Sequence, residues 1–576
     1  MEEKSSDTIG VPAEAKKFIE CVARKCSWRR SIRKEVRREL SAHFEDALCD
    51  VDEAEKNGVA QGLIKDFGDP VLLAALIGRG KRRCLPWWER TLLATVKIAA
   101  VLLVVGVVVD LVLSRHSSEA LQAEIARLHS TGAPTSVHDI IEKAQQDPRT
   151  KALSKEERLK RCPATALLYE ISDMHPELAT DVHGKRVYDL GDTDTFVKQL
   201  YETWDADTAA AVSETLSRNR DLLEKIQALA ALPPDGQNDI IWFQSQYWPE
   251  KRRELGVSMR EASPTMGADM LTAPYLLGLL DTCALLELDA VHAVQEGGAD
   301  AALDDATATM TLSHHTDMVS HTLIGTMVAV ALRSRALAIT VQPLLNRADV
   351  SDTAANRFLA VAAQMDCSEA FAKSLAWERM FMVSALKSGE LENYLLSRQS
   401  DPSSLLGKLH GTPFDPYILR ARLLPFLNNN DLATWIGYLN RLVDAANLRY
   451  PEYCAAGAVW KNDLLNTSSW IAPITKIGMP NLVDIKDDIT DCEVLEDLAR
   501  VAFALRRFKL VRGAYPDALQ ALVPDFLSEV PMDRFSEKPL LYRKAGEGCV
   551  VYSVGKEQDN EGGEGDYDYC TWKLTR

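Results

Sequence analysis

Two histidines and an aspartate near the middle of the chain have the residue types of a small catalytic or metal site. His314, Asp317 and His321 are separated by three and four residues. On one continuous helix these spacings place all three on one face, where a histidine can act as a general base with an orienting carboxylate, or the three can hold a metal ion. The alternative is that residues 313–320 form the solvated start of a helix over 322–344, without a chemical role.

Other catalytic motifs are missing from the sequence. It contains no GxSxG nucleophile elbow, no HExxH zinc helix, no GxxxxGK[ST] phosphate loop and no GxGxxG turn. We therefore expect a protein that is not an enzyme, and keep as an alternative a hydrolase whose site has no familiar motif.

A second candidate site is an acidic loop near the C-terminus. Six carboxylates lie between residues 557 and 568, together with glycines that allow tight folding. Hard cations such as calcium prefer clustered carboxylate and carbonyl oxygens on flexible backbone. The predicted ligands are Glu557, Asp559, Asp566 and Asp568, and the alternative is a solvated acidic hairpin without metal.

The cysteines suggest one disulfide. Seven of the eleven cysteines follow the apolar segment described below, and an odd number cannot all pair within the chain. Cys549 and Cys570 are the best candidates, because each lies in a predicted strand and the two strands should be antiparallel neighbours. Their register decides whether the two residues meet.

One segment is long and apolar enough to cross a bilayer. Residues 92–113 read LLATVKIAAVLLVVGVVVDLVL, and a spanning helix needs about 20 residues. Lys97 and Asp110 lie near opposite ends, where each can reach its own interface. The segment follows about ninety residues, so we do not interpret it as a cleavable signal peptide. The alternative is a buried helix of a soluble domain.

The flanks of this segment predict its orientation. Basic residues crowd its N-terminal side and two tryptophans lie at interfacial depth, whereas basic residues are sparse on the other side. We therefore expect the bacterial inner membrane, with a cytoplasmic N-terminus and a periplasmic C-terminal region. The flanking residues are Arg79, Lys81, Arg82, Arg83, Trp87, Trp88 and Arg90.

Composition excludes nucleic acid as a partner. The net charge of the 576 residues is −17, yet residues 1–90 hold 18 Lys/Arg and 16 Asp/Glu, so the rest of the chain carries −19. Polyphosphate binding needs a basic face, which this acidic region does not offer.

The predicted fold is mainly α, in four parts. We expect a small helical domain over 1–90, a transmembrane helix over 91–114, an irregular all-helical region over 115–484 and an α+β domain over 485–576. The helical periods support the third part. Its clearest helices are 221–232, 270–286, 322–344, 354–365, 369–386 and 432–448.

The cytoplasmic part resembles a known helical module. Residues 12–26 and 28–56 have a helical period, and Gly58 is expected to end the second helix. From Ile32 to the run Phe67-Gly68-Asp69-Pro70, the sequence is similar to the small domain ahead of bacterial permease segments and in proteins partnered with PadR-type regulators. The resemblance, over residues 28–75, implies a docking module for a cytoplasmic protein.

The C-terminal part resembles the head of the major pseudopilin of type II secretion. The likeness rests on ALRRFKLVRGAYPDALQALVP, PMDRFSEKPLLYR and YSVGKEQDNEGGEGDYDYCTW, and covers about eighty residues. It implies calcium binding in the loop, with Asp568 at the late ligand position and Glu557 or Asp559 at the early one. The chain does not begin with a pilin leader, so we do not expect it to polymerise.

The whole chain also looks like large single-span proteins of planctomycetes, through residues 128–141, 323–335 and 377–379. We expect a membrane-anchored envelope protein that binds or scaffolds another envelope component. The alternative is a transmembrane regulator acting through the cytoplasmic helices. An anti-sigma factor has this layout, but Cys21, Cys26, Cys49 and His43 lack the spacing of its zinc motif.

Overall fold

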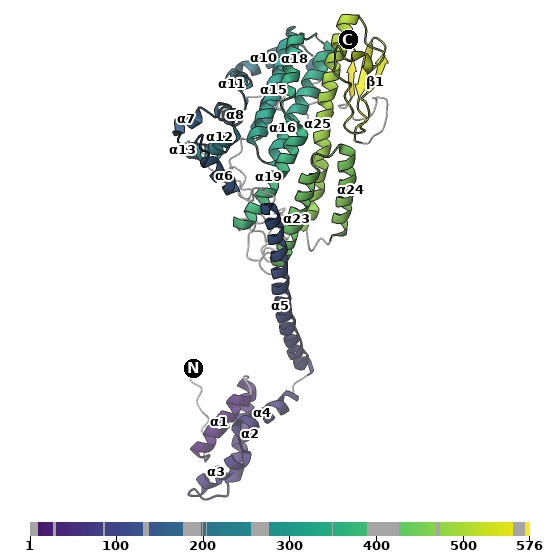
Figure 1. Ribbon diagram of the computed structural model, residues 1–576. Coiled ribbons are helices and arrows are strands. Elements are labelled where there is room, and N and C mark those ends of the chain that lie inside the picture. Colours follow the sequence, from purple (N-terminus) through teal and green to yellow (C-terminus); the bar gives the residue numbers. More distant parts are fainter. Residues whose placement is uncertain are drawn as a thin grey trace. The chain divides into compact units, whose positions relative to one another are not determined.

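The computed structural model is mainly helical and contains one small sheet, as predicted (Figure 1). It divides into two compact units, Met1–Val109 and Asp110–Arg576. The described residues are 10–26, 30–83, 87–130, 137–174, 176, 197, 200–202, 204–254, 276–347, 349–388, 425–467, 473–556 and 571–575.

The first unit has its own hydrophobic core. Val36, Leu40, Phe44 and Leu48 recur every four residues and are all buried, so α2 presents one apolar stripe to its neighbours. Phe18 adds an aromatic contact with Phe44, at a ring distance of 6.4 Å. The helices of this unit are α1 (Ala13–Cys26), α2 (Arg30–Leu48), α3 (Lys56–Phe67) and α4 (Pro70–Arg83), followed by the first part of α5 (Trp87–Ser130).

The predicted end of the second helix at Gly58 is wrong. The helix α2 ends at Leu48, where its apolar stripe ends, and Gly58 lies in the first turn of α3. The glycine that ends a helix is Gly68, which follows α3 with φ +74°, a backbone conformation that favours glycine. Pro70 then begins α4, and the Asp69 carboxylate accepts a hydrogen bond from the Val71 amide at 2.7 Å.

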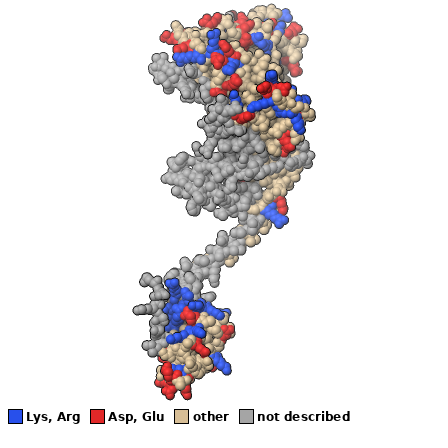
Figure 2. Space-filling view, turned by 90° about the vertical axis from the view of Figure 1, so that its left-hand side faces the viewer, with Lys and Arg blue, Asp and Glu red and all other residues tan. Residues whose placement is uncertain are grey.

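Basic residues gather on this first unit (Figure 2). Arg37 of α2 forms a two-pronged ion pair with Glu20 of α1, at 2.6 and 2.8 Å, which lowers the pKa of the Glu20 carboxyl through these hydrogen bonds. Arg30, Lys34 and Arg38 on the same helix are exposed.

The second unit is built mostly from helices. Their bounds are α6 (Val137–Gln145), α7 (Lys155–Leu159), α8 (Pro163–Asp173), α10 (Ala206–Arg218), α11 (Arg220–Ala230), α12 (Gln237–Trp242), η1 (Phe243–Tyr247), α13 (Trp248–Glu254), α14 (Leu276–Gln295), α15 (Ala299–Val319), α16 (Leu323–Arg335), η4 (Ala336–Val341), α17 (Gln342–Arg347), α18 (Asp352–Ala362), α19 (Cys367–Ser388), α23 (Pro425–Ala445), α24 (Tyr450–Asn466) and α25 (Pro473–Arg512). Helices α14, α16 and α18 pack on α15 (Figure 1).

The C-terminal sheet packs on helices from the middle of the chain. Strands β1 (Leu541–Ala545), β2 (Gly548–Tyr552) and β3 (Thr571–Leu574) form an antiparallel sheet in the order β1-β2-β3, preceded by the short helix η5 (Leu519–Leu522). Trp572, Leu505 and Leu303 belong to one core, which joins β3 to α25 and α15. The predicted domain start at 485 falls inside α25, which is continuous from residue 473 to residue 512.

One helical stretch of the described residues, Leu323–Arg347, is long and apolar enough to cross a membrane. It comprises α16, η4 and α17, and 61% of its apolar window is buried within the protein. The apolar composition of this stretch therefore also fits a helix that is buried in a protein core.

Candidate functional site

The predicted histidine site is divided by the end of a helix. His314 and Asp317 lie in the last turns of α15, but α15 ends at Val319 and His321 follows outside it. Ser320 is extended, with φ −88° and ψ 117°, and Thr322 then caps α16 by accepting a hydrogen bond from the Gly325 amide at 3.2 Å. The expectation of one continuous face is wrong, because this turn redirects the chain before His321.

Gly325 allows this turn. A Cβ atom at Gly325 would lie 1.5 Å from the Ser320 hydroxyl oxygen, so the Ser320 side chain can pack here only because residue 325 has no side chain. The alternative expectation of a solvated segment over 313–320 is also wrong. Ser313, His315 and Thr316 are buried, and the Ser313 hydroxyl donates to the Ala329 carbonyl at 2.6 Å.

Asp317 and His321 still line one cavity, from opposite sides of the turn. Lys373 and Trp377 of α19 complete its wall, and its volume is about 10 Å³, enough for a single water molecule. The His321 ring stacks on Trp377 at 4.2 Å, and its Nε2 lies 3.1 Å from the Gln244 Oε1. Because the Gln244 amide nitrogen already donates to the Val319 carbonyl, Oε1 is the acceptor and His321 Nε2 carries the proton.

His314 faces a different hollow, of about 420 Å³, which is lined also by Pro233, His315 and Gln364. Its Nδ1 has no hydrogen-bond partner among the described residues. The structure therefore does not bring the three predicted residues together in one site.

Burial keeps these histidines neutral. It lowers the pKa of His321 to about 3 and that of His314 to about 4, and it raises the pKa of the Asp317 carboxyl. Asp317 accepts a hydrogen bond from the Thr326 hydroxyl at 3.2 Å and has Lys373 nearby. A general base needs a substrate within reach and a pKa near the working pH. The Asp317–His321 cavity is too small for a substrate, and the pKa of His321, about 3, lies far below neutral pH.

These histidines predict an acid-sensitive fold. Because their pKa values are lower in the folded chain than the usual 6.5, the unfolded chain binds more protons between about pH 6.5 and pH 4. We expect the free energy of unfolding to fall over this window by about 1.4 kcal/mol per pH unit for each such histidine, with the raised pKa of Asp317 offsetting part of the loss.

Chemical denaturation at a series of pH values measures this effect. His321→Gln should reduce the slope, whereas His116→Gln, at an exposed position of α5, is the matched control and should leave it unchanged. A slope that is the same in wild type and His321→Gln would contradict the assignment.

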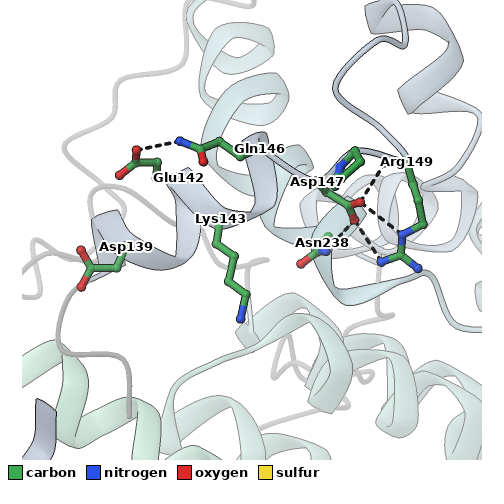
Figure 3. Close-up of a pocket in the computed structure, with 8 residues that line it drawn as sticks. Asp139, Glu142, Lys143, Gln146, Asp147, Arg149 and Asn238 are labelled. Atoms are coloured by element: carbon green, nitrogen blue, oxygen red, sulfur yellow. Dashed lines mark hydrogen bonds and ion pairs between the residues drawn. The ribbon is translucent and has the colours of Figure 1, made fainter. Parts of the chain in front are cut away.

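A surface hollow of about 450 Å³ lies beside α6 (Figure 3). The Asp147 carboxylate lies between Arg149 and Asn238, with hydrogen bonds of 2.9 Å from the Arg149 amide and 2.8 Å from the Asn238 amide. The guanidinium of Arg149 lowers the pKa of Asp147. Because neighbouring residues already hydrogen-bond this carboxylate, we assign it a structural role in the turn after α6.

The predicted calcium ligands Glu557, Asp559, Asp566 and Asp568 lie outside the described residues. Hydrogen bonds hold the described chain just before them. Asp533 is 1% exposed and accepts from the Ser553 hydroxyl at 2.8 Å and the Val554 amide at 3.0 Å, which fixes the backbone just after β2. Tyr552 and Thr571, which flank segment 553–570, are paired partners in the sheet.

The strands predicted for the disulfide pair are antiparallel neighbours. Cys549 is 1% exposed and lies opposite Leu574 in the register of β2 and β3, whereas Cys570 lies outside the described residues. Thr571, the neighbour of Cys570, lies opposite Tyr552, three residues from Cys549, so this register does not favour the pairing of Cys549 with Cys570, which stays a prediction.

The predicted membrane segment forms part of one helix, α5. Eight apolar residues from Ile98 to Leu113 are between 39% and 64% exposed, with Leu102 the most exposed. The predicted flanking residues lie at the end of α4 (Arg82, Arg83) and the start of α5 (Trp87, Trp88, Arg90).

Comparisons with protein-family models, with curated proteins and with solved structures found no match to this chain.

Proposed function

We propose that this chain is a single-pass protein of the bacterial inner membrane whose outer region binds or scaffolds another envelope protein. The observation that carries the proposal is the row of exposed apolar side chains on α5. Monomeric soluble proteins rarely expose a contiguous apolar surface of this length, whereas a bilayer would cover it completely. We place residues 92–113 in the bilayer for this reason.

The charge distribution supports the orientation. Basic residues on the N-terminal flank favour a cytoplasmic N-terminus and a periplasmic C-terminal region. Cys49 is exposed in the first unit, so a membrane-impermeant thiol reagent should label it only after the inner membrane is opened. Retention of the full chain in alkaline-washed membranes tests the anchor, and recovery in the soluble fraction would overturn the proposal.

The helix α4 supports a position close to the bilayer. Its inner face packs on α1, yet Val71, Leu72 and Leu76 on its outer face are 49%, 66% and 63% exposed. Only residues 84–86 separate α4 from α5, a link that spans at most about 14 Å when extended. An apolar helix face beside basic residues and close to a span fits the headgroup region of a membrane.

A binding role fits the outer region better than catalysis. The cavity lined by Asp317 and His321 holds one water molecule at most, and burial suppresses the charged forms of both groups. The cytoplasmic helices remain our proposed docking module for a second, cytoplasmic protein. The resemblance of residues 28–75 to a permease-associated domain supports this part of the proposal.

We also propose that the acidic loop binds calcium, as its resemblance to a pseudopilin head implies. The support is the six carboxylates of 557–568 and the closure of both loop ends by the β2–β3 pair. Calcium should raise the melting temperature of the full-length protein, and Asp566→Asn with Asp568→Asn should abolish the rise. Asp525→Asn, at an exposed position outside the loop, is the control. If titration calorimetry with calcium gives no heat of binding and calcium does not shift the melting temperature, the site is excluded.

A further inference from the structure

Two cysteines face each other where α19 packs on α25. Cys367 is the first residue of α19 and Cys492 lies in the middle of α25, 125 positions later in the chain. Their Sγ atoms are 3.9 Å apart, and the residues are 2% and 0% exposed. Among the described cysteines, these two have their sulfur atoms in contact. Neither residue belongs to a recognisable sequence motif.

Polar contacts on both sides of Cys492 hold the start of α19 in place. The amide and the hydroxyl of Ser368 donate to the Glu493 carboxylate at 3.1 and 2.7 Å. Lys486 donates to the Ser368 hydroxyl at 2.8 Å and to the Ala446 carbonyl at 3.0 Å. Ser368, the residue after Cys367, is thus attached to α25 both six positions before Cys492 and one position after it, which fixes the two thiols opposite each other.

The neighbouring charges are already balanced without a metal ion. Glu496 lies within 4.8 Å of both sulfurs, so the three side chains have the composition of a partial metal site. The Arg333 side chain, however, donates to the Glu496 carboxylate at 2.6 Å. A divalent cation here would lie beside a buried guanidinium and would have three protein ligands among the described residues, where zinc in structural sites takes four.

Burial also disfavours the thiolate that a metal requires. The pKa of the Cys367 thiol is raised well above its usual value by the adjacent Cys492 and by desolvation. A disulfide is uncharged and has no thiol proton that needs a hydrogen-bond acceptor. Burial in the same surroundings therefore costs it little free energy.

We propose that Cys367 and Cys492 form a disulfide bond in the native protein, joining α19 covalently to α25. The inference rests on the proposed placement of the second unit outside the cytoplasm, because disulfides persist in oxidising compartments. The sulfurs must approach from 3.9 Å to about 2.0 Å, a movement that side-chain rotation and a small helix shift can supply.

The reaction is thiol–disulfide exchange with an oxidised dithiol protein or with glutathione disulfide. One cysteine thiolate attacks the disulfide of the oxidant and releases one of its sulfurs as a thiolate, giving a mixed disulfide. The thiolate of the second cysteine then attacks the sulfur of the first cysteine in the mixed disulfide, and the remaining oxidant sulfur leaves as a thiolate. The pair loses two protons and two electrons, and the oxidant becomes two thiols. Since the folded site is closed to solvent, the exchange takes place before α19 and α25 have packed together.

Mass spectrometry of the full-length protein tests the bond. Protein from cells treated with N-ethylmaleimide is digested without reduction, and a peptide that joins residues 367 and 492 is expected. Reduction should lower the melting temperature of wild type by several degrees, and should lower that of the Cys367→Ser/Cys492→Ser variant by clearly less. Cys162→Ser is the control, since Cys162 is buried and its thiol donates to the Asp239 carbonyl at 3.3 Å.

Three results would overturn the proposal. Free thiols at both positions would do so, as would a bond from either cysteine to a different one. Zinc bound in proportion to the protein, and lost in Cys492→Ser, would assign the pair to a metal instead.

A second arm refolds the reduced full-length protein with glutathione disulfide. A bond that forms in this arm but not in cells overturns the native disulfide and points to failure of the outer placement. A bond in neither arm overturns the pairing alone, because membrane retention and Cys49 labelling test the placement separately.

Discussion

Full-length protein with Val105→Asp and Val108→Asp is expected to leave the membrane fraction that retains the wild type. Both residues lie on the exposed face of α5, at 52% and 53% exposure, near the middle of the proposed span. An aspartate at the centre of a spanning helix costs about 2.5 to 3.5 kcal/mol, so two of them should reduce membrane insertion by at least about a thousandfold. Insertion of the translated protein into inner-membrane vesicles, followed by alkaline extraction, measures the effect without interference from degradation in cells.

The matched control places the same charge on the other apolar helix. Ile324 is 66% exposed on α16, which belongs to the stretch that is also long and apolar enough to cross a membrane. Ile324→Asp should leave extraction unchanged, because the rest of that stretch is largely buried in the second unit. Release of Ile324→Asp together with retention of the α5 variant would move the anchor to residues 323–347.

The sequence was a good guide wherever one periodic pattern faces one surface. The helical period of residues 28–56 indicated an amphipathic helix, and Val36, Leu40 and Phe44 are buried on one face of α2. The apolar segment 92–113 was predicted to be helical and lies within α5, where it has a row of exposed apolar side chains. Both patterns depend on helical geometry alone, so they can be recognised without knowing what packs against them.

The sequence failed where a backbone turn depends on a tertiary contact. The spacing of His314, Asp317 and His321 assumed one helix, but the packing of Ser320 against Gly325 ends α15 between the second and third residue. Gly58 misled for a different reason: a glycine inside a first turn looks the same in sequence as one that ends a helix.

Contacts between distant helices left almost no signal in the sequence. Cys367 and Cys492 are brought together only by the packing of α19 on α25, so the sequence pointed to Cys549 and Cys570 instead. Arg333 is an arginine in an apolar helical segment, and its burial becomes apparent only with its partner on α25. Both contacts join α25 to another helix of the second unit, and neither pair was among the predicted site residues.

The Arg333–Glu496 pair predicts the largest loss of stability from a single substitution. Arg333 is 0% exposed, and its guanidinium donates to Glu496 and to the Ala362 carbonyl. Burial opposes the charge on Arg333, but Glu496 outweighs it and raises the pKa of the guanidinium. Glu496→Leu leaves this cation buried without its partner, and should lower the free energy of unfolding by about 3 to 5 kcal/mol.

Denaturant unfolding of the full-length protein in detergent, followed by tryptophan fluorescence, measures this loss. The double variant Arg333→Met/Glu496→Leu should recover most of it, because two apolar side chains of similar volume carry no buried charge. Glu250→Gln is the surface control: Glu250 pairs with Lys155 at 2.6 Å with both side chains 51% exposed, and its loss should change stability by less than about 1 kcal/mol. Since Cys492 is one helical turn from Glu496, each variant is measured with and without reductant. A double variant no more stable than Glu496→Leu under both conditions would show that the loss comes from packing and not from the unpaired charge.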